Sequence, residues 1–222
     1  MPNHVINCLE VIGEPKEVKA FVALVSHNKS DVFDFNKIIS IPEELAGTNS
    51  PVEILSQEQI DQTKKKYSKF IKDNVRSKYS FGMTEEDSRR LIAKYGCNNW
   101  YDWNNFNWGT KWNAYEVSKW KFTNDGASVS FYTAWSPPLP LLRHASKKFP
   151  NLIFNIKFAE EDSLFVGSFA VKDWTENNIV CDWNSIEGVK IRKHIIDYLK
   201  RENQVAKKLP KNDFKKSIKK RK

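Results

Sequence analysis

Cysteine is scarce in this chain of 222 residues, and the three cysteines are far apart in the sequence. Cys8, Cys97 and Cys181 form no C-x-x-C pair, so the sequence indicates neither a disulfide framework nor a cysteine metal site. The four histidines also lack the close spacing of metal ligands. We therefore expect no metal and no other cofactor, and we expect the thiols to be reduced.

Long apolar runs are absent as well. No stretch approaches the roughly 20 apolar residues that a membrane-spanning helix needs, and the N-terminus has no apolar segment typical of a signal peptide. The sequence also contains no P-loop, no G-x-G-x-x-G and no G-x-S-x-G motif. These absences predict a soluble, cytoplasmic protein with no membrane partner, and they leave an enzyme without sequence support.

Positive charge is in excess only at the end of the chain. The formal net charge is +9, and residues 200–222 contain 11 basic and 2 acidic residues, which leaves 25 of each sign elsewhere. The sequence therefore predicts a neutral body with a basic tail. Such a tail is either a solvated end or an electrostatic arm for nucleic acid or an acidic partner. The candidate contact residues in the tail are Lys207, Lys208, Lys211, Lys215, Lys216, Lys219, Lys220, Arg221 and Lys222.

Tryptophan, by contrast, is abundant, and six of the eight tryptophans lie between Asn98 and Trp135. Each indole buries a large area and needs a partner for its N–H group, so we expect this segment to organise the fold. We predict structural roles for Trp108, Gly109, Lys111, Trp112, Trp135 and Pro137. We predict exposure and partner contact for Trp100, Trp103 and Phe106, by stacking on bases or by anchoring a protein interface.

Asparagines alternate with these aromatic residues in what reads as a Trp-rich loop. Their side chains would either cap turns or bond to a partner. They are Asn98, Asn99, Asn104, Asn105, Asn107 and Asn113.

Hydrophobic periodicity predicts six strands and several helices along the chain. The expected strands cover residues 5–12, 114–122, 128–134, 152–158, 164–171 and 177–183. The expected helices outside the segment 27–111 start at Pro15 and after an N-cap at Ser136, and the last one covers residues 188–209. Without residues 27–111 and the last elements, the order is β-α-β-β-α-β, which is the ferredoxin-like split βαβ arrangement.

The predicted fold class is therefore α+β. We expect a ferredoxin-like antiparallel sheet with two helices on one face, a large, mostly helical insertion after the first helix, and a C-terminal helix with a basic tail. The expected parts are a core of residues 1–26 and 112–183, an insertion of residues 27–111, a helix of residues 184–209 and a flexible tail of residues 210–222.

Local signals define several ends and turns. Ser56 with Gln59 forms a capping box for a helix whose apolar side continues to Val75. A second helix of the insertion starts at Thr84 and stops at Gly96. Residues 124–126 (Asn-Asp-Gly) predict a tight hairpin turn with positive φ, and residues 160–163 (Glu-Glu-Asp-Ser) predict a solvated turn.

Four segments, in this order, resemble the YubB-like family of phage and plasmid proteins. They are residues 1–4 (MPNH), 35–45 (FNKIISIPEEL), 108–114 (WGTKWNA) and 133–138 (TAWSPP), and the resemblance covers most of residues 1–171. It implies a mobile-element origin and a ferredoxin-like core. It supplies no catalytic residues.

Three functions remain open on these observations. The first is a non-enzymatic, phage-like binding protein that antagonises a host nucleoprotein or defence complex, for example as a CRISPR-effector inhibitor. The second is a module that binds RNA or single-stranded DNA with its basic tail and aromatic residues. The third is an enzyme acting on nucleotides or nucleic acid, which requires Asp34, Glu43 or Asp102 to meet a lysine or histidine in one cleft.

Overall fold

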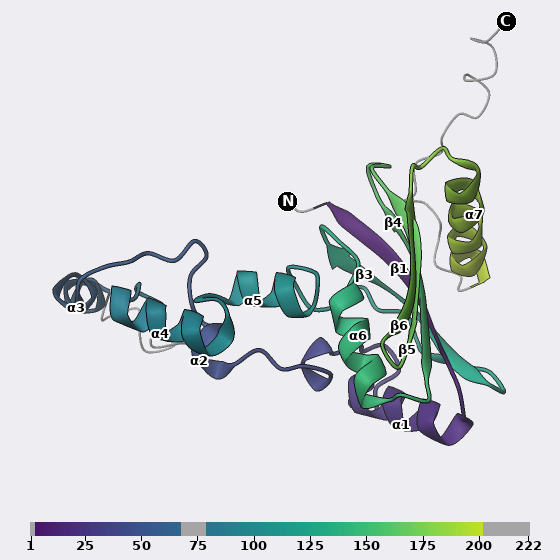
Figure 1. The fold of residues 1–222 in the computed structure, drawn as a ribbon, viewed down its shortest axis with the longest axis horizontal. Coiled ribbons are helices and arrows are strands. Elements are labelled where there is room, and N and C mark those ends of the chain that lie inside the picture. Colours follow the sequence, from purple (N-terminus) through teal and green to yellow (C-terminus); the bar gives the residue numbers. More distant parts are fainter. Residues whose placement is uncertain (1–2, 68–78, 202–222) are drawn as a thin grey trace, which may run out of the picture.

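The structure, a computed structural model that describes residues 3–67 and 79–201, is built on a six-stranded antiparallel sheet (Figure 1). The strand order across the sheet is β2-β3-β1-β4-β5-β6. The strands are β1 (His4–Ile12), β2 (Lys121–Phe122), β3 (Gly126–Ala134), β4 (Ile153–Glu160), β5 (Val166–Lys172) and β6 (Thr175–Cys181).

The first four strands have the ferredoxin-like arrangement. β1 lies between β3 and β4 and is antiparallel to both, while β2 pairs with the outer side of β3. The helix α1 (Pro15–Ser26) follows β1, and α6 (Leu139–Lys148) connects β3 to β4. This is the β-α-β-β-α-β pattern that the sequence predicts, so the α+β, ferredoxin-like fold class is confirmed. β5 and β6 extend the sheet beyond β4.

Both faces of the sheet are covered, because successive side chains of a strand point to opposite faces. Val5, Leu9 and Val11 of β1 belong to the main core, together with α1 and α6. Ile6 and Cys8 point the other way and pack in a second cluster with α7 (Ile186–Arg201). Figure 1 shows α7 on the face of the sheet opposite α1 and α6.

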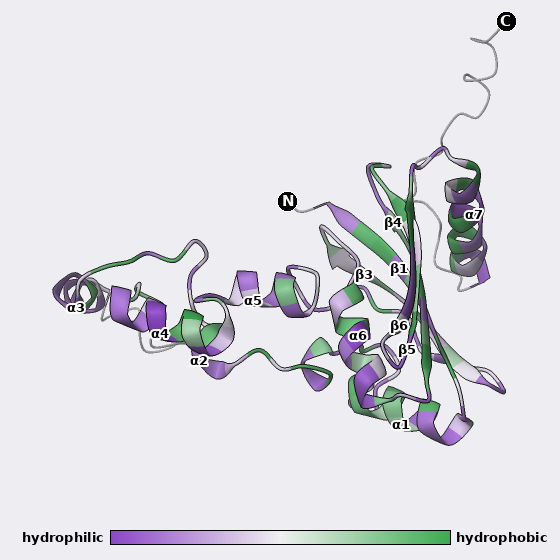
Figure 2. Ribbon diagram, in the orientation of Figure 1, coloured by the Kyte–Doolittle hydropathy of each residue, from purple (hydrophilic) through white to green (hydrophobic). Residues whose placement is uncertain are grey.

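The insertion projects sideways from the sheet (Figure 1). Its described elements are a short 3-10 helix η1 (Phe35–Lys37) and the helices α2 (Glu43–Ala46), α3 (Gln57–Lys66), α4 (Glu85–Tyr95) and α5 (Trp100–Asn107). The main core continues into it, since Leu45, Leu91 and Trp103 belong to the same buried cluster as the sheet. In Figure 2, α3 and α4 are mostly hydrophilic, as expected for helices with large solvent-facing sides.

The two ends of the insertion are tied together beside the sheet. Asn113 accepts the backbone N–H of Phe35 at 2.9 Å and donates to Asp34 Oδ1 at 2.8 Å. The indole Nε1 of Trp120 donates to the carbonyl of Val32 at 2.9 Å. We call Val32, Asp34, Phe35, Asn113 and Trp120 the insertion junction.

The strand expected at residues 114–122 is mostly wrong. In this segment β3 pairs with β2 and with an isolated bridge at Tyr115, and it accepts one further backbone hydrogen bond from Ser118 at 2.8 Å. Glu116 has φ +47°, a conformation that interrupts an extended strand. The backbone N–H of Trp120 donates to the carbonyl of Ser30 at 2.7 Å and so is not available to β3. The backbone hydrogen bonds of this segment are therefore divided between β3 and the start of the insertion.

The hairpin turn at residues 124–126 also differs from the prediction, because none of these three residues has a positive φ. Gly126 is instead required by close approach, since an ideal Cβ there would lie 2.6 Å from the carbonyl oxygen of Val11. The two consecutive positive φ angles expected of a tight hairpin occur at Asp173 and Trp174, between β5 and β6.

Capping was predicted correctly in the insertion and wrongly at α6. Thr84 caps α4, Gly96 ends it with φ +79°, and Ser56 forms the expected capping box. The N-cap of α6 is Pro138 rather than Ser136, no side chain caps this helix, and the Ser136 hydroxyl donates to the carbonyl of Gly109.

Two predicted helices end differently or leave the described residues. α3 ends at Lys66, and the part of the prediction that covers residues 68–75 lies outside the described part of the chain. α7 is described to Arg201, and the rest of the predicted helix and the basic tail also lie outside it.

The turn after β4 is not fully solvated as expected. Glu160 is 1% exposed, because its carboxylate accepts the Asn3 amide at 2.7 Å and the N–H of Leu164 at 3.1 Å.

Among the described helices, none combines the length and apolar character that crossing a bilayer requires.

Candidate partner-binding site

The segment predicted as a Trp-rich loop contains a helix, α5, and its asparagines have structural roles. The Asn99 side chain caps the helix by accepting the N–H of Asp102 at 2.9 Å. Asn105 and Asn107 donate to the carbonyls four residues earlier, at 2.7 and 3.0 Å. The Asn-rich composition favours a loop, but an asparagine at the N-cap position is a helix-start signal that the prediction missed.

The helix places two tryptophans inside. Trp103 and Trp108 are 5% and 4% exposed, and their rings meet edge to face at 5.8 Å. The Trp108 indole donates to the carbonyl of Ile39 at 2.9 Å, which fits its predicted structural role. The predicted exposure of Trp103 is wrong. Trp100 is only partly buried, and its backbone N–H donates to the Thr48 hydroxyl at 2.9 Å.

Gly109 allows α5 to turn sharply toward α6. It has φ +80°, and an ideal Cβ would lie 2.3 Å from Pro140 and 3.2 Å from the carbonyl oxygen of the buried Pro137. The next residue, Thr110, accepts the N–H of Ala134 and donates to its carbonyl. These contacts join the end of α5 to the end of β3.

Trp112 and Trp135 were predicted as structural residues, but both are substantially exposed, by 40% and 47%. Trp135 follows the last residue of β3 with φ +74°, a conformation that turns the chain away from the sheet. Lys111 lies over the Trp112 ring, with Nζ 4.8 Å from the ring centre. These two indoles therefore contribute to the surface as well as to the fold.

A cavity of about 390 Å³ lies between α4 and α5. We call it the α4–α5 groove, and it is lined by Ile92, Tyr95, Gly96, Cys97, Asn98, Asp102 and Phe106. Phe106 is 81% exposed and Ile92 is 49% exposed, so large apolar side chains border the groove. Asp102 and Phe106 are four residues apart on α5 and share its exposed side.

A charge network fixes one wall of the groove. The Glu44 carboxylate accepts the Lys94 ammonium and the Tyr95 hydroxyl, each at 2.7 Å, and pairs with Arg90 at 2.8 Å. The hydrogen bonds from Lys94, Tyr95 and Arg90 lower the pKa of Glu44 to about 2. The cations on this side of α4 are thereby matched, and the exposed carboxylate of Asp102 remains as the charge in the groove.

Cys97, also in the groove, is not poised for nucleophilic chemistry. Burial raises the pKa of its thiol, and the nearby Asp102 raises it further despite a bond to the carbonyl of Asn99. The neutral thiol is the less reactive form, so the groove offers no activated cysteine nucleophile.

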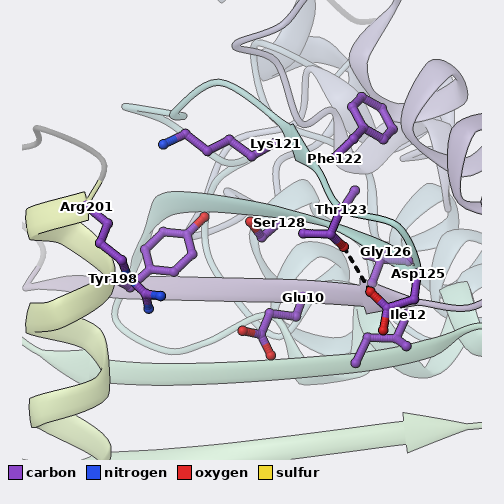
Figure 3. Close-up of a pocket in the computed structure, with 12 residues that line it drawn as sticks. Glu10, Ile12, Lys121, Phe122, Thr123, Asp125, Gly126, Ser128, Tyr198 and Arg201 are labelled. Carbon is purple, nitrogen blue, oxygen red and sulfur yellow. Dashed lines mark hydrogen bonds between the residues drawn. The ribbon is translucent and has the colours of Figure 1, made fainter.

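A second cavity, of about 470 Å³, lies on the α7 side of the sheet (Figure 3). Figure 3 shows Tyr198 and Arg201 of α7 facing Glu10 and Ser128 across this cleft. Lys121 and Arg201 bring positive charge, and Glu10 and Asp125 bring negative charge, so the lining favours neither an anion nor a cation.

The three acids named for an enzyme lie in different places, although one of them, Asp34, meets a histidine. Asp34 lies in a third hollow, paired with His27 at 2.8 Å, whereas Asp102 lines the α4–α5 groove and Glu43 lines none of these three hollows. Burial opposes the ionisation of Asp34, but hydrogen bonds from His27, Asn113 and Asn36 outweigh it and lower its pKa. Within residues 3–67 and 79–201, no group of three potential metal ligands occurs.

The aromatic group on the α7 side of the sheet is close to negative charge. Tyr115 and Tyr132 stack at 6.1 Å, with His4 edge-on to both. Burial, followed by the nearby Glu161 and Glu116, raises the pKa of Tyr115 to about 12. Carboxylates beside these rings oppose the approach of phosphate groups, which disfavours this surface for nucleic acid.

Comparison with known proteins gives one family and one structure. Residues 107–189 match the family described as "Ferredoxin-like domain in Api92-like protein". A solved structure titled as protein api92 from Yersinia pseudotuberculosis is 11% identical, with 83% of this chain and 99% of that chain covered and a TM-score of 0.45. No curated protein matches the chain.

The matched residues run from the end of α5 to the start of α7 and include β2 to β6. The match extends past residue 171, where the resemblance to YubB-like proteins ends, and the narrower assignment to that family is not confirmed. Over residues 107–189, the chain is similar to the ferredoxin-like domain of Api92-like proteins.

Proposed function

We propose that this protein is a non-enzymatic binding protein whose α4–α5 groove receives a side chain of a protein partner. The observation that supports it is Phe106, which is 81% exposed beside an apolar-edged cavity of about 390 Å³. An aromatic side chain at the edge of a preformed pocket is the usual anchor of a protein interface, because burying it on association releases ordered water from a large area.

The lining of the groove indicates the chemistry of the partner. Ile92, Tyr95 and Phe106 suit an aliphatic or aromatic side chain, while Asp102 suits a lysine or arginine next to it. The preferred ligand is therefore a segment of a basic protein surface that presents one apolar residue beside a cation.

Basic protein surfaces of this kind are typical of nucleoprotein complexes, which bind the phosphate backbone through lysine and arginine. The resemblance of four segments to phage and plasmid proteins makes a host complex the natural target. We therefore retain antagonism of a host nucleoprotein or defence complex, such as a CRISPR effector, as the proposed biological role.

The test is affinity capture of the tagged protein from a bacterial lysate, with and without nuclease. Phe106→Ser and Asp102→Lys should each reduce capture of a nuclease-resistant protein partner, with Phe106→Ser weakening the affinity by about 30-fold or more if Phe106 is a hot spot. Leu24→Ser is the matched control, since Leu24 is a surface residue of α1 with 39% exposure outside the groove.

Equal capture by Phe106→Ser and by the unchanged protein would contradict the proposal. So would capture that disappears entirely on nuclease treatment, because it would show binding through nucleic acid alone.

A further inference from the structure

The outer edge of the sheet carries a long, unprotected strand, β6. All its residues are exposed except Cys181, which is partly buried. No described strand pairs with its outer side. We propose that β6 pairs with β6 of a second copy of this chain, in antiparallel orientation, so that the two sheets join.

β6 lacks the features that normally protect an edge strand. It contains no lysine and no proline, and it pairs with β5 through seven consecutive residues, from Val166 with Cys181 to Lys172 with Thr175, without a bulge. The opposite edge is different, since β2 has only two residues, one of which is Lys121. Long, regular edges of the β6 kind are templates for another strand.

Exposed apolar side chains surround this edge. Ile179 and Val180 are 38% and 58% exposed, and as neighbours in a strand they point to opposite faces. Trp174, in the turn before β6, is 53% exposed, and Ile186 at the start of α7 is 81% exposed. A second strand placed along β6 would therefore cover apolar surface on both faces of the sheet.

The charge of the strand favours a second copy over a charged partner. Glu176 is the only charged residue in β6, and Arg143 binds its carboxylate through two nitrogens, at 2.6 and 3.0 Å. The strand is thus electrically balanced by its own chain, so an identical strand can approach without repulsion. A two-fold axis makes the edge complementary to itself over its full length.

Symmetry restricts the register of such a pair. With a two-fold axis normal to the sheet, one residue of β6 faces its own counterpart, and an axis beside Asn178 or Ile179, near the middle of the strand, keeps the most residues paired. Both registers place the edge, and not the insertion, at the contact, and Figure 1 shows the insertion projecting away from β6.

Sedimentation velocity of the full chain over a range of concentrations tests the pairing. The dimer fraction should rise with concentration, and Val180→Lys should shift the protein to monomer, because it places an uncompensated charge on the edge. Phe106→Ser is the control and should leave the dimer unchanged, since Phe106 lies on α5. Conversely, Val180→Lys should leave partner capture through the groove intact, so failure of one proposal is separable from failure of the other.

Cysteine crosslinking then distinguishes the registers. In a Cys181→Ser background, Asn178→Cys and Ile179→Cys are oxidised separately, and one of them should give a disulfide-linked dimer. A monomer at every concentration, a dimer that persists in Val180→Lys, or no crosslink at either position would overturn the proposal. A monomer that instead binds extended peptides along β6 would also overturn it.

Discussion

Gly109 shows how a single residue controls the connection between the insertion and the sheet. Its φ of +80° and the 2.3 Å approach of Pro140 to an ideal Cβ leave no room for a side chain. We predict that Gly109→Ala lowers the free energy of unfolding by about 2–5 kcal/mol, from backbone strain and overpacking together. Urea denaturation monitored by tryptophan fluorescence measures this change.

Gly96 provides the matched control for that prediction. It has nearly the same φ, +79°, but nothing lies within 4 Å of its ideal Cβ. Gly96→Ala should therefore show only the conformational cost of a left-handed alanine, about 1–2 kcal/mol. Equal losses in the two variants would show that crowding at Gly109 is unimportant.

We predict that the hydrogen bonds of Glu44 make the free energy of unfolding sensitive to acid. Its pKa falls from 4.5 to about 2 in the folded protein, because Lys94, Tyr95 and Arg90 donate hydrogen bonds to the carboxylate. A lowered pKa adds stability above the unfolded pKa, and this contribution is lost as the pH falls from about 4.5 toward 2. Glu44→Gln should therefore destabilise the protein at pH 7 and flatten the pH dependence of unfolding in that window.

The neighbouring carboxylate supplies the comparison for this titration. Glu43→Gln changes the adjacent, exposed acid of α2, which takes no part in the network around Glu44, and should preserve the slope between pH 4.5 and 2. An NMR titration of the Glu44 carboxyl near pH 4.5 would show that the network does not form in solution.

The burial of individual tryptophans could not be predicted from the sequence. The partner of the Trp108 indole is the carbonyl of Ile39, 69 residues away, and nothing local signals such a contact. Trp103 and Phe106 also have similar sequence surroundings, yet one is 5% and the other 81% exposed. Only the position of α5 against the core separates them, so the candidate site was predicted in part, through Phe106.

At the scale of elements, α7 depends on a small buried cluster. Ile195 is fully buried in it, whereas Ile196 is only partly buried. We predict that Ile195→Ala lowers the free energy of unfolding by about 2–5 kcal/mol, through lost burial and an internal cavity. Ile196→Ala should cost clearly less. Thermal unfolding of both variants checks this, and equal effects would mean that α7 does not pack as described.

Elements with strong internal periodicity were predictable from the sequence. β1, β4 and α1 each follow one period closely, and they appear where expected. The strand over residues 114–122 failed because Glu116 has a positive φ and the backbone N–H of Trp120 donates to Ser30 and not to β3. α5 failed because asparagine favours turns unless the helix cap and the surrounding packing decide otherwise.

For the whole molecule, the order of elements was sufficient to predict a ferredoxin-like sheet, since few topologies satisfy short, antiparallel connections. The position of α7 was not predictable in the same way. Its apolar side fits either face of a sheet, and the choice depends on Ile6, Cys8 and Val166 presenting a second apolar surface.

The uneven charge of the whole chain predicts its behaviour toward nucleic acid. Residues 202–222 hold 9 basic and 2 acidic residues, or +7 of the net charge of +9, so removing them should abolish binding to single-stranded DNA at low salt. If the tail makes about 6–10 phosphate contacts, the affinity of the full chain should fall by about 10³–10⁵ between 50 and 200 mM salt. Fluorescence anisotropy measures both effects, and salt-independent binding would contradict them.

The insertion junction has a consequence for how this protein can change over generations. Asn113 and Trp120 hold the two ends of the insertion together, so the chain between Phe35 and Asn113 forms a closed loop. The entropic cost of closing such a loop rises only with the logarithm of its length. Doubling the length of such a loop raises the free energy of closing it by about 0.6 kcal/mol. Changes of length in the chain beyond the junction should therefore cost little closure entropy, provided that Leu45, Leu91 and Trp103 keep their places in the core that they share with the sheet.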